Sequence, residues 1–457
     1  MENKKTKIGF VSLGCSKNLM DTEVMLSELN AAGYEITAEE TEADIIILNT
    51  CGFIKEAKTE AIDNILDIAW LKQNASLKGL IVTGCLVQRY GQEILNEMPE
   101  VDAILSVGSI HEIVNAVKAV ENGEKFVSVK KPEEAALGGD RIVTTPEHYA
   151  YMKIAEGCDN RCTYCAIPDI RGKFRSRAME DLLKEAKDME ALGVRELILV
   201  AQDTTRYGED LYGEYKLHEL IRLITDNTNI PWIRILYCYP DKITDGLIEE
   251  FRNNERLVKY VDIPIQHISE RILKKMNRHG GKEAILSSIK KLRQIPDMII
   301  RSTVIVGFPG ENGTDFAELM EFLKETRFDR LGAFEYSKED GTPAASFGSQ
   351  VSAAKKKERR DAVMEQQAEI VAELNAEKEG KIVKVLIEGY DPVSESYYSR
   401  SYADAPEIDG KIYITGAPKN AFFPGDFVDV KIYASLDCDL VAEVFSGTKH
   451  KSKMNDE

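Results

Sequence analysis

Short apolar runs alternate with amphipathic segments over the first 140 residues. Apolar, β-branched runs of this length predict buried strands, and the segments between them repeat apolar residues at helical spacing. Such a pattern is typical of a parallel sheet with helices on both faces, so we predict an α/β domain over residues 1–140. The predicted strands are Lys7–Leu13, Ala43–Asn49, Gly79–Thr83 and Ala103–Val107, and the helices include Asn18–Ala32 and Ile54–Trp70, the latter with Ile62, Ile65, Leu66 and Ala69 on one face.

A second series of strands and helices follows a stretch interrupted by Pro and Gly. Residues 122–148 have no periodic pattern, which predicts a linker. Six further apolar runs, separated by helical segments, then predict a partial (β/α)6 barrel over residues 141–350. Catalytic groups of such barrels lie at the carboxyl ends of the strands. The predicted strands are Ala150–Ala155, Glu196–Ala201, Trp232–Tyr237, Tyr260–Ile263, Met298–Val306 and Arg330–Tyr336.

A charged helix and a β-rich segment complete the chain. Residues 351–380 predict a connecting helix that places Val363, Ile370 and Leu374 near one face. Over residues 381–446, short apolar runs alternate with Gly and Pro turns, which predicts a small five-stranded barrel. Residues 447–457 form a predicted tail. The apolar runs are Ile382–Ile387, Lys411–Ile414, Phe427–Val430 and Leu440–Val444.

Three cysteines lie together after the first strand of the predicted partial barrel. Cys158, Cys162 and Cys165 have the spacing CxxxCxxC, so one loop can offer three thiolates to an iron–sulfur cube. A fully ligated [4Fe–4S] cluster takes four ligands, so one iron would stay open to a small molecule. The alternative is a zinc knuckle, but no second CxxC pair or nearby histidine completes its usual four ligands. We therefore assign these cysteines as metal ligands at a catalytic centre.

Three more cysteines occupy equivalent places in the first domain. Cys15, Cys51 and Cys85 each lie just past the carboxyl end of a predicted parallel strand, with a glycine beside each. Flavodoxin-like sheets bind ligands along that edge, so the three thiols are expected to converge on a second, three-ligand iron–sulfur cluster. Both clusters lie at strand ends, so the first domain is expected to cover the mouth of the barrel. The alternative is that all three are buried core cysteines.

The composition of the chain indicates its compartment and the kind of partner it binds. No apolar run approaches the length of a membrane helix and no signal-peptide core begins the chain, so we expect a cytoplasmic protein without a membrane partner. Eight cysteines in such a compartment indicate metal or catalytic groups before disulfides. The net charge of −18 disfavours nucleic acid and favours a basic protein partner. The basic run Arg171–Arg177 could bind an anion or form a solvated turn.

The cysteine loop, with Tyr164 before its last cysteine, resembles that of the radical S-adenosylmethionine enzymes. The resemblance implies a [4Fe–4S] cluster whose open iron chelates S-adenosylmethionine, and reductive cleavage that yields a 5′-deoxyadenosyl radical. By position we assign Tyr164, Gln202, Arg301 and Gly307 to the binding of this cofactor. His267 closes another strand and is either satisfied by the backbone or functional, and Cys238 is expected to serve packing.

The order of two cysteine triplets, partial barrel and terminal barrel resembles the methylthiotransferases across essentially the whole chain. The match is strongest to the group that modifies an aspartate of small-subunit ribosomal protein twelve. This implies two [4Fe–4S] clusters, transfer of a methylthio group to the aspartate β-carbon, and a reducing electron donor. The alternatives are methylthiolation of an adenosine in tRNA and an electron carrier without enzyme activity. The matching segments are Gly14–Asn18, Ala201–Thr205, Asp262–His267 and Arg400–Gly410.

The terminal barrel resembles TRAM domains, which often bind RNA. Its net charge, however, has the opposite sign to that of an RNA-binding domain. Residues 381–446 carry a net charge of −5, whereas RNA-binding modules are basic. We therefore expect tRNA to be an unlikely partner and the terminal barrel to meet a basic protein through Asp404, Glu407 and Asp409. The alternative is that these acidic side chains are simply solvent-exposed and bind no partner.

Overall fold

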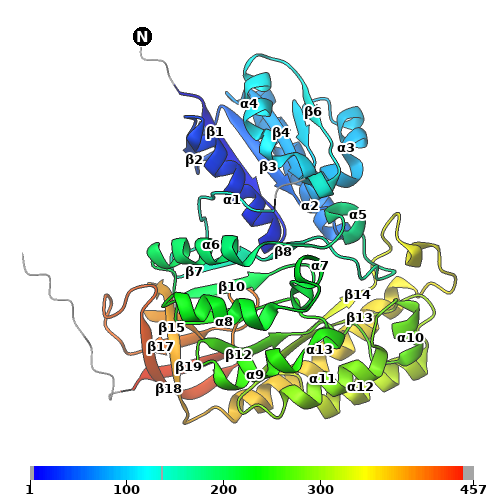
Figure 1. Ribbon diagram of the computed structural model, residues 1–457, viewed down its shortest axis with the longest axis vertical. Helices are drawn as coiled ribbons and strands as arrows, with labels where there is room; N and C mark the ends of the chain where they lie inside the picture. Colours follow the sequence, from blue (N-terminus) through cyan, green and yellow to red (C-terminus); the bar gives the residue numbers. More distant parts are fainter. Residues whose placement is uncertain (1–4, 135–136, 446–457) are drawn as a thin grey trace, which may run out of the picture.

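Six parallel strands form the sheet of the N-terminal domain, drawn in blue and cyan in Figure 1. The computed structural model describes residues 5–134 and 137–445. The sheet confirms the predicted parallel architecture and contains all four predicted strands. In spatial order its strands are β2 (Glu35–Thr37), β1 (Lys7–Ser12), β3 (Ile45–Thr50), β4 (Gly79–Gly84), β5 (Ala103–Leu105) and β6 (Phe126–Ser128).

The two edge strands of this sheet, β2 and β6, were not predicted. Each has only three residues, and its side chains are mostly exposed or half-buried. A strand that buries no continuous run leaves no periodic signal in the sequence. Because β6 lies within residues 122–148, the prediction of an entirely irregular linker was wrong at that point.

Helices cover both faces of the N-terminal sheet, as predicted. α1 (Ser16–Ala31) and α4 (Ile113–Glu121) pack on one face, where Met25 and Val117 are fully buried. α2 (Lys55–Asn74) and α3 (Cys85–Glu97) pack on the other, around Ile65 and Leu86. Each sheet face therefore has its own apolar core.

A second sheet of six parallel strands forms the partial barrel, which confirms all six predicted strands. Its strand order is β14 (Arg330–Glu335), β13 (Ile299–Val306), β12 (Leu257–Asp262), β11 (Trp232–Ile235), β10 (Glu196–Val200) and β7 (Tyr149–Lys153). The helices between the strands pack against the convex face, and Leu197 and Ile233 belong to that core. The principal ones are α6 (Met179–Ala191), α8 (Leu217–Asn227), α9 (Asp245–Asn253), α11 (Gly281–Leu292) and α12 (Gly313–Thr326).

The concave face of this sheet contacts both flanking domains. Tyr151 and Val200 share a buried cluster with Met20 from α1 and with Leu386 and Ala405 from the C-terminal segment. The N-terminal domain lies over the carboxyl ends of the strands, as Figure 1 shows, and the C-terminal barrel packs against the opposite end. The sequence-based expectation that the first domain covers the barrel mouth is thus confirmed.

The connecting helix and the five-stranded terminal barrel are also present. α13 (Ala353–Ala376) buries Val363 and Ile370, as predicted. The barrel is closed in the order β15 (Ile382–Asp391), β16 (Ser396–Ser401), β17 (Ile412–Thr415), β19 (Asp439–Val444) and β18 (Phe427–Leu436). β16 was missed because Ser-Tyr-Tyr-Ser-Arg-Ser has no apolar alternation. The predicted tail lies outside the described residues, and over the described ranges no helix is long and apolar enough to cross a membrane.

The carboxylates expected to meet a partner instead join the terminal barrel to the partial barrel. Asp404 accepts a hydrogen bond from Arg330 at 2.6 Å and is 3 % exposed. Asp409 accepts one from the Tyr260 hydroxyl at 2.7 Å, and Glu407 one from Tyr149 at 3.0 Å. The expectation that these three residues form a docking surface was therefore wrong, because two of the three side chains are buried in an internal interface.

Candidate active site

The loop with Cys158, Cys162 and Cys165 follows β7 and the two-residue strand β8 (Ala155–Glu156). The Asn160 side chain donates to the Cys158 sulfur at 3.5 Å, and the Ile167 backbone N–H donates to the Cys165 sulfur at 3.5 Å. Hydrogen bonds to sulfur stabilise a thiolate and tune a cluster bound to it.

Backbone geometry at Gly157 fixes the start of this loop. Its φ is +81°, and a Cβ there would lie 2.0 Å from the carbonyl oxygen of Lys173. Both the conformation and the close approach require glycine. The loop therefore leaves β8 along a path that no other residue type can follow without a shift of the backbone.

The second triplet converges as predicted. Cys15, Cys51 and Cys85 follow β1, β3 and β4, which are adjacent in the sheet. A Cβ built on Gly14 would lie 3.2 Å from the Cys51 sulfur, and one on Gly52 would lie 3.0 Å from the carbonyl carbon of Cys85. Cys85 is buried, but Cys51 is half-buried and Cys15 is exposed, which rules out the alternative of three buried core cysteines.

The donor sets fit iron–sulfur clusters better than a single ion. Over residues 5–134 and 137–445, no three His, Cys, Asp or Glu side chains meet closely enough to hold one metal ion. A cubane does not require such closeness, since each cysteine binds a different iron. Although desolvation opposes ionisation, the charges of Lys17 and Arg171 lower the pKa of Cys15. These cations also suit a cluster that carries net negative charge with its thiolates.

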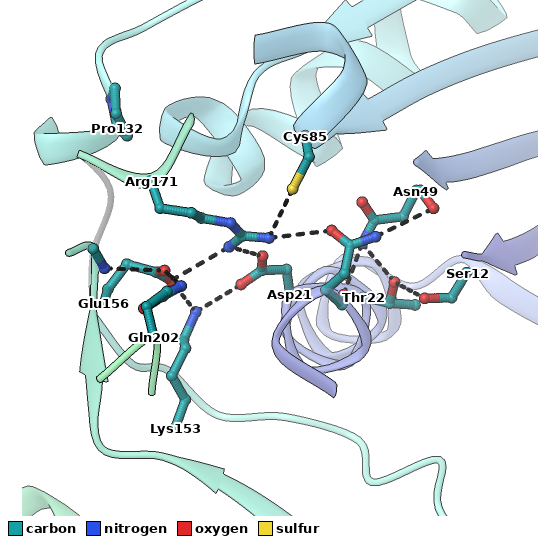
Figure 2. A network of polar contacts seen from close by, with 12 residues as sticks. Ser12, Asp21, Thr22, Asn49, Cys85, Pro132, Lys153, Glu156, Arg171 and Gln202 are labelled. Atoms are coloured by element: carbon teal, nitrogen blue, oxygen red, sulfur yellow. Dashed lines mark hydrogen bonds and ion pairs between the residues drawn. The ribbon is translucent and has the colours of Figure 1, made fainter. Parts of the chain in front are cut away.

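Arg171, from the helix that follows the first cysteine loop, contacts Cys85 of the second triplet, as Figure 2 shows. It ends α5 (Ile167–Arg171), the short helix after the Cys165 loop, and is 2 % exposed. Its guanidinium donates to Asp21 of α1 at 2.6 Å and to the Cys85 sulfur at 3.3 Å. The expectation that the run Arg171–Arg177 is a ligand site or a solvated turn was wrong for Arg171, because this side chain is buried against the other domain.

A second cation completes the buried network at the domain junction. Lys153 of β7 donates to Asp21 and to Glu156, each at 2.7 Å, and Gln202 donates to Glu156 at 2.6 Å (Figure 2). Burial alone would raise the pKa of Glu156, but Lys153 and Arg171 hold it at about 2. The carboxylate is therefore ionised, and two acids and two bases neutralise one another beneath both cysteine loops.

The four residues assigned to cofactor binding lie at different parts of the mouth. Gln202 joins the buried network, and its side-chain oxygen is buried without a hydrogen-bond partner among the described residues. Tyr164 packs against the cluster of Phe308 and Tyr336. Arg301 donates to Asp262 at 2.8 Å, and Gly307 has φ +72°. A free acceptor at Gln202 suits the ammonium group of an amino acid, while the roles of all four residues stay predictions.

Several residues around the loop were not found from the sequence. The Tyr239 hydroxyl lies 3.3 Å from the Cys162 sulfur, and the Arg278 guanidinium stacks 3.7 Å from the Tyr239 ring centroid. Asp203 accepts from Asn160 at 2.8 Å and from Lys242 at 3.1 Å. Position after a strand could have indicated Asp203 and Tyr239, but Arg278 lies in a turn after a helix and carries no such signal.

Two residues left open by the sequence have structural roles. The Nδ1 of His267 accepts from the backbone N–H groups of Ile268 and Ser269, each at 2.9 Å, and burial lowers its pKa to about 4. The interpretation of a histidine satisfied by the backbone is confirmed for Nδ1 only, because Nε2 is buried without a hydrogen-bond partner among the described residues. Cys238 lies in the apolar core of the partial barrel, which confirms its packing role.

Comparisons with known families match each of the three parts of the chain. Residues 7–106 match a family described as the uncharacterized protein family UPF0004, and residues 152–323 match the Radical SAM superfamily. Residues 380–445 match the TRAM domain. The matched ranges correspond to the N-terminal sheet, most of the partial barrel and the terminal barrel.

A solved structure with the same overall fold is the radical S-adenosylmethionine methyltransferase TsrM from Kitasatospora setae, with cobalamin and a [4Fe–4S] cluster bound. It superimposes with a TM-score of 0.57 at 12 % identity, over 74 % of this chain and 77 % of TsrM. At this identity the likeness concerns the fold alone.

Curated relatives are similar over nearly the whole chain. Ribosomal protein uS12 methylthiotransferase RimO of Clostridium tetani is 48 % identical over 442 residues, which is 96 % of this chain and 98 % of the relative. RimO of Clostridium botulinum is 49 % identical over 443 residues, again 96 % and 98 %. The chain therefore belongs to the RimO family of methylthiotransferases within the radical S-adenosylmethionine superfamily.

Proposed function

We propose that the protein transfers a methylthio group to the β-carbon of an aspartate in ribosomal protein uS12. The observation that carries this proposal is the pair of cysteine triplets on two docked domains, where α5 donates to Cys165 from Ile167 and to Cys85 from Arg171. One triplet follows the first strand of a radical S-adenosylmethionine barrel, and the other lies at the ligand-binding edge of an open sheet. Two clusters at one mouth suit a reaction that needs both a radical and a sulfur source.

Each cofactor has a set of residues that would hold it. Cys158, Cys162 and Cys165 would bind one [4Fe–4S] cluster, and S-adenosylmethionine would lie against its open iron beside Tyr164, Gln202, Arg301 and Gly307. Cys15, Cys51 and Cys85 would bind the second cluster. When bound, these groups supply the radical that removes a hydrogen from the unactivated carbon, the sulfur and the methyl group.

The chain's own residues hold the two domains together at this mouth. Arg171 and Lys153 neutralise Asp21 and Glu156 at the junction, so the N-terminal domain can stay docked over the strand ends. On the other side Lys58 and Arg89 contact Glu339 of the loop after β14, at 2.8 and 3.2 Å. Ion pairs therefore join the two domains on two sides of the junction.

The proposed reaction requires two partners besides S-adenosylmethionine. One is uS12, whose binding to ribosomal RNA makes it basic and thus complementary to a chain of net charge −18. The other is a reducing electron donor. A tRNA substrate is disfavoured by the same charge, and a ribosomal-protein substrate places the activity in the cytoplasm.

The test is an anaerobic assay of the reconstituted protein with S-adenosylmethionine, a reductant and either purified uS12 or tRNA. We expect mass spectrometry to find a methylthio group on one aspartate-containing peptide of uS12. A methylthio group on tRNA adenosine, with unmodified uS12, would contradict the proposal. Cleavage of S-adenosylmethionine with neither product would contradict it as well.

A further inference from the structure

Helix α2 exposes a row of large apolar side chains. Ile62, Leu66 and Trp70 recur every fourth residue and are 37, 52 and 61 % exposed. Side chains at this spacing lie along one side of a helix. The sequence pattern placed Ile62 and Leu66 on one face with Ile65 and Ala69, but the structure buries only the latter two. Ile65 and Ala69 pack α2 against the rest of the domain, whereas the exposed row does not belong to that core.

Four carboxylates accompany this row. Glu56, Glu60, Asp63 and Asp67 are all exposed on α2. Among the described residues none of the four takes part in an ion pair closer than 4 Å, whereas Lys58 is paired with Glu339. We call Ile62, Leu66 and Trp70, together with these four carboxylates, the α2 face. It combines apolar area with carboxylates that make no ion pair among the described residues.

The α2 face leads directly to the second cysteine triplet. α2 begins at Lys55, in the turn after Cys51, and the Gly52 carbonyl accepts from Arg89 at 2.7 Å. Arg89 and Lys58 both contact Glu339 of the loop that follows β14. The amino end of α2 is therefore fixed at the domain junction, and a protein bound along the α2 face would reach the mouth.

We propose that the α2 face binds the basic protein substrate of the reaction, uS12. This inference rests on the proposed function. Ribosomal proteins carry positive charge because they neutralise RNA phosphates, and opposite charges steer such a protein to an acidic face. An exposed Trp beside apolar neighbours is the residue type that most often dominates binding energy at an interface. Nucleic acid and a second copy of the α2 face are disfavoured, because both would bring like charge to it.

The structure of the terminal barrel supports this location. Its carboxylates Asp404 and Asp409 are buried against Arg330 and Tyr260 and cannot reach a partner. The α2 face, by contrast, is exposed and continuous with the loop that carries Cys51. Charge complementarity to uS12 is thus expected beside the cysteine triplets rather than on the terminal barrel.

The charge is tested by the variant Asp63→Lys/Asp67→Lys. Its matched control is Glu365→Lys/Glu369→Lys on α13, where two exposed acids have the same four-residue spacing. Binding of purified uS12 is measured with the reconstituted protein at low and high salt. We expect the α2 variant to weaken binding about tenfold at low salt and less at high salt, because salt screens exposed charges. The affinity of the control variant for uS12 should stay within about twofold of the wild-type value.

The apolar row is tested by Leu66→Ser/Trp70→Ala, with Leu192→Ser as the control at a side chain that is 62 % exposed elsewhere. We expect the first variant to raise the KM for uS12 about tenfold, independently of salt, while kcat and uncoupled cleavage of S-adenosylmethionine stay unchanged. Leu192→Ser should change neither KM nor kcat.

Four results would overturn the inference. Unchanged uS12 binding by both α2 variants, with a wild type that modifies uS12, would reject the α2 face and leave the proposed function intact. Loss of donor-driven cleavage of S-adenosylmethionine without loss of uS12 binding would assign the face to the electron donor. A wild-type dimer that the variants convert to a monomer would assign it to a second copy. A wild type that never modifies uS12 would instead reject the proposed function, and this inference with it.

Discussion

The Arg171 Nη2 donates a hydrogen bond to the Cys85 sulfur at 3.3 Å, across the junction of two domains. Arg171 ends a five-residue helix whose first backbone N–H, that of Ile167, donates to the Cys165 sulfur. One rigid turn of chain therefore contacts a cysteine of each triplet. This arrangement couples the spacing of the two sites to the docking of the domains.

Replacing Arg171 with Met should loosen this junction. Among the described residues, the change leaves the buried Asp21 and Glu156 with Lys153 as their one ion-pair partner, and breaking a buried pair costs about 3–5 kcal/mol. We expect a lower thermal midpoint and faster hydrogen exchange in α1 and α5. Arg171→Lys should recover part of the loss, because it keeps the charge but not the planar fork.

The control for this variant is Arg252→Met, which removes one member of the exposed Arg252–Glu249 pair. Exposed pairs contribute about 0–1 kcal/mol, so its thermal midpoint should stay close to the wild-type value. Equal effects of Arg171→Met and Arg252→Met would show that the buried network does not hold the domains together.

The two cysteine triplets should be separable. Alanine at Cys158, Cys162 and Cys165 should abolish cleavage of S-adenosylmethionine and leave roughly half of the iron, because the other triplet keeps its own cluster. Alanine at Cys15, Cys51 and Cys85 should retain cleavage but stop sulfur insertion. Iron analysis and an anaerobic cleavage assay measure both properties. A folded variant of either kind that had lost all iron would refute two independent sites.

Gly157→Ala should damage the first cysteine loop specifically. The added Cβ meets a backbone oxygen 2.0 Å away at φ +81°, so the loop must shift, and strain of this kind costs about 1–3 kcal/mol. We expect loss of iron from that site and loss of S-adenosylmethionine cleavage. Gly193→Ala is the matched control, since Gly193 has φ +88° but no atom within 4 Å of its added Cβ. Equal iron content in the two variants would contradict this expectation.

The sequence predicted the elements that bury continuous apolar runs. β3 and β4, buried along their whole length, were found, as were the six strands of the partial barrel. β2, β6 and β16 were missed because they are short, exposed or polar. The periodicity of apolar residues reflects burial against a core. Strands that contribute few side chains to a core therefore produce no recognisable pattern in the sequence.

The cysteine triplets could be predicted for a different reason. Their ligand spacing and strand-end positions are local features, and parallel topology alone brings Cys15, Cys51 and Cys85 together. The partners of Arg171 could not be predicted, because Asp21 and Cys85 lie 150 and 86 residues away in the sequence. The same holds for Asp404, whose charge suggested a surface role until its contact with Arg330 was known.

The ion pair of Arg330 and Asp404 should give the terminal interface a defined pH dependence. Burial alone would raise the pKa of Asp404, but Arg330 and then Lys378 lower it. A carboxyl group whose folded pKa is depressed stabilises the fold above its unfolded pKa of about 3.9, and that stability is lost as pH falls through the folded pKa. In the wild type this contribution is therefore constant between pH 7.5 and 5.

Replacing Arg330 with Gln should reverse the direction in which the pKa of Asp404 is shifted. Burial then dominates, the folded pKa of Asp404 rises above the unfolded value, and the buried charge destabilises the protein by about 3 kcal/mol at neutral pH. Because protonation removes that charge, we expect the difference in thermal midpoint between wild type and variant to narrow from pH 7.5 to 5. In the double variant Arg330→Gln/Asp404→Asn the difference should not change with pH. A difference that widens as pH falls would show that Asp404 is not the responsible group.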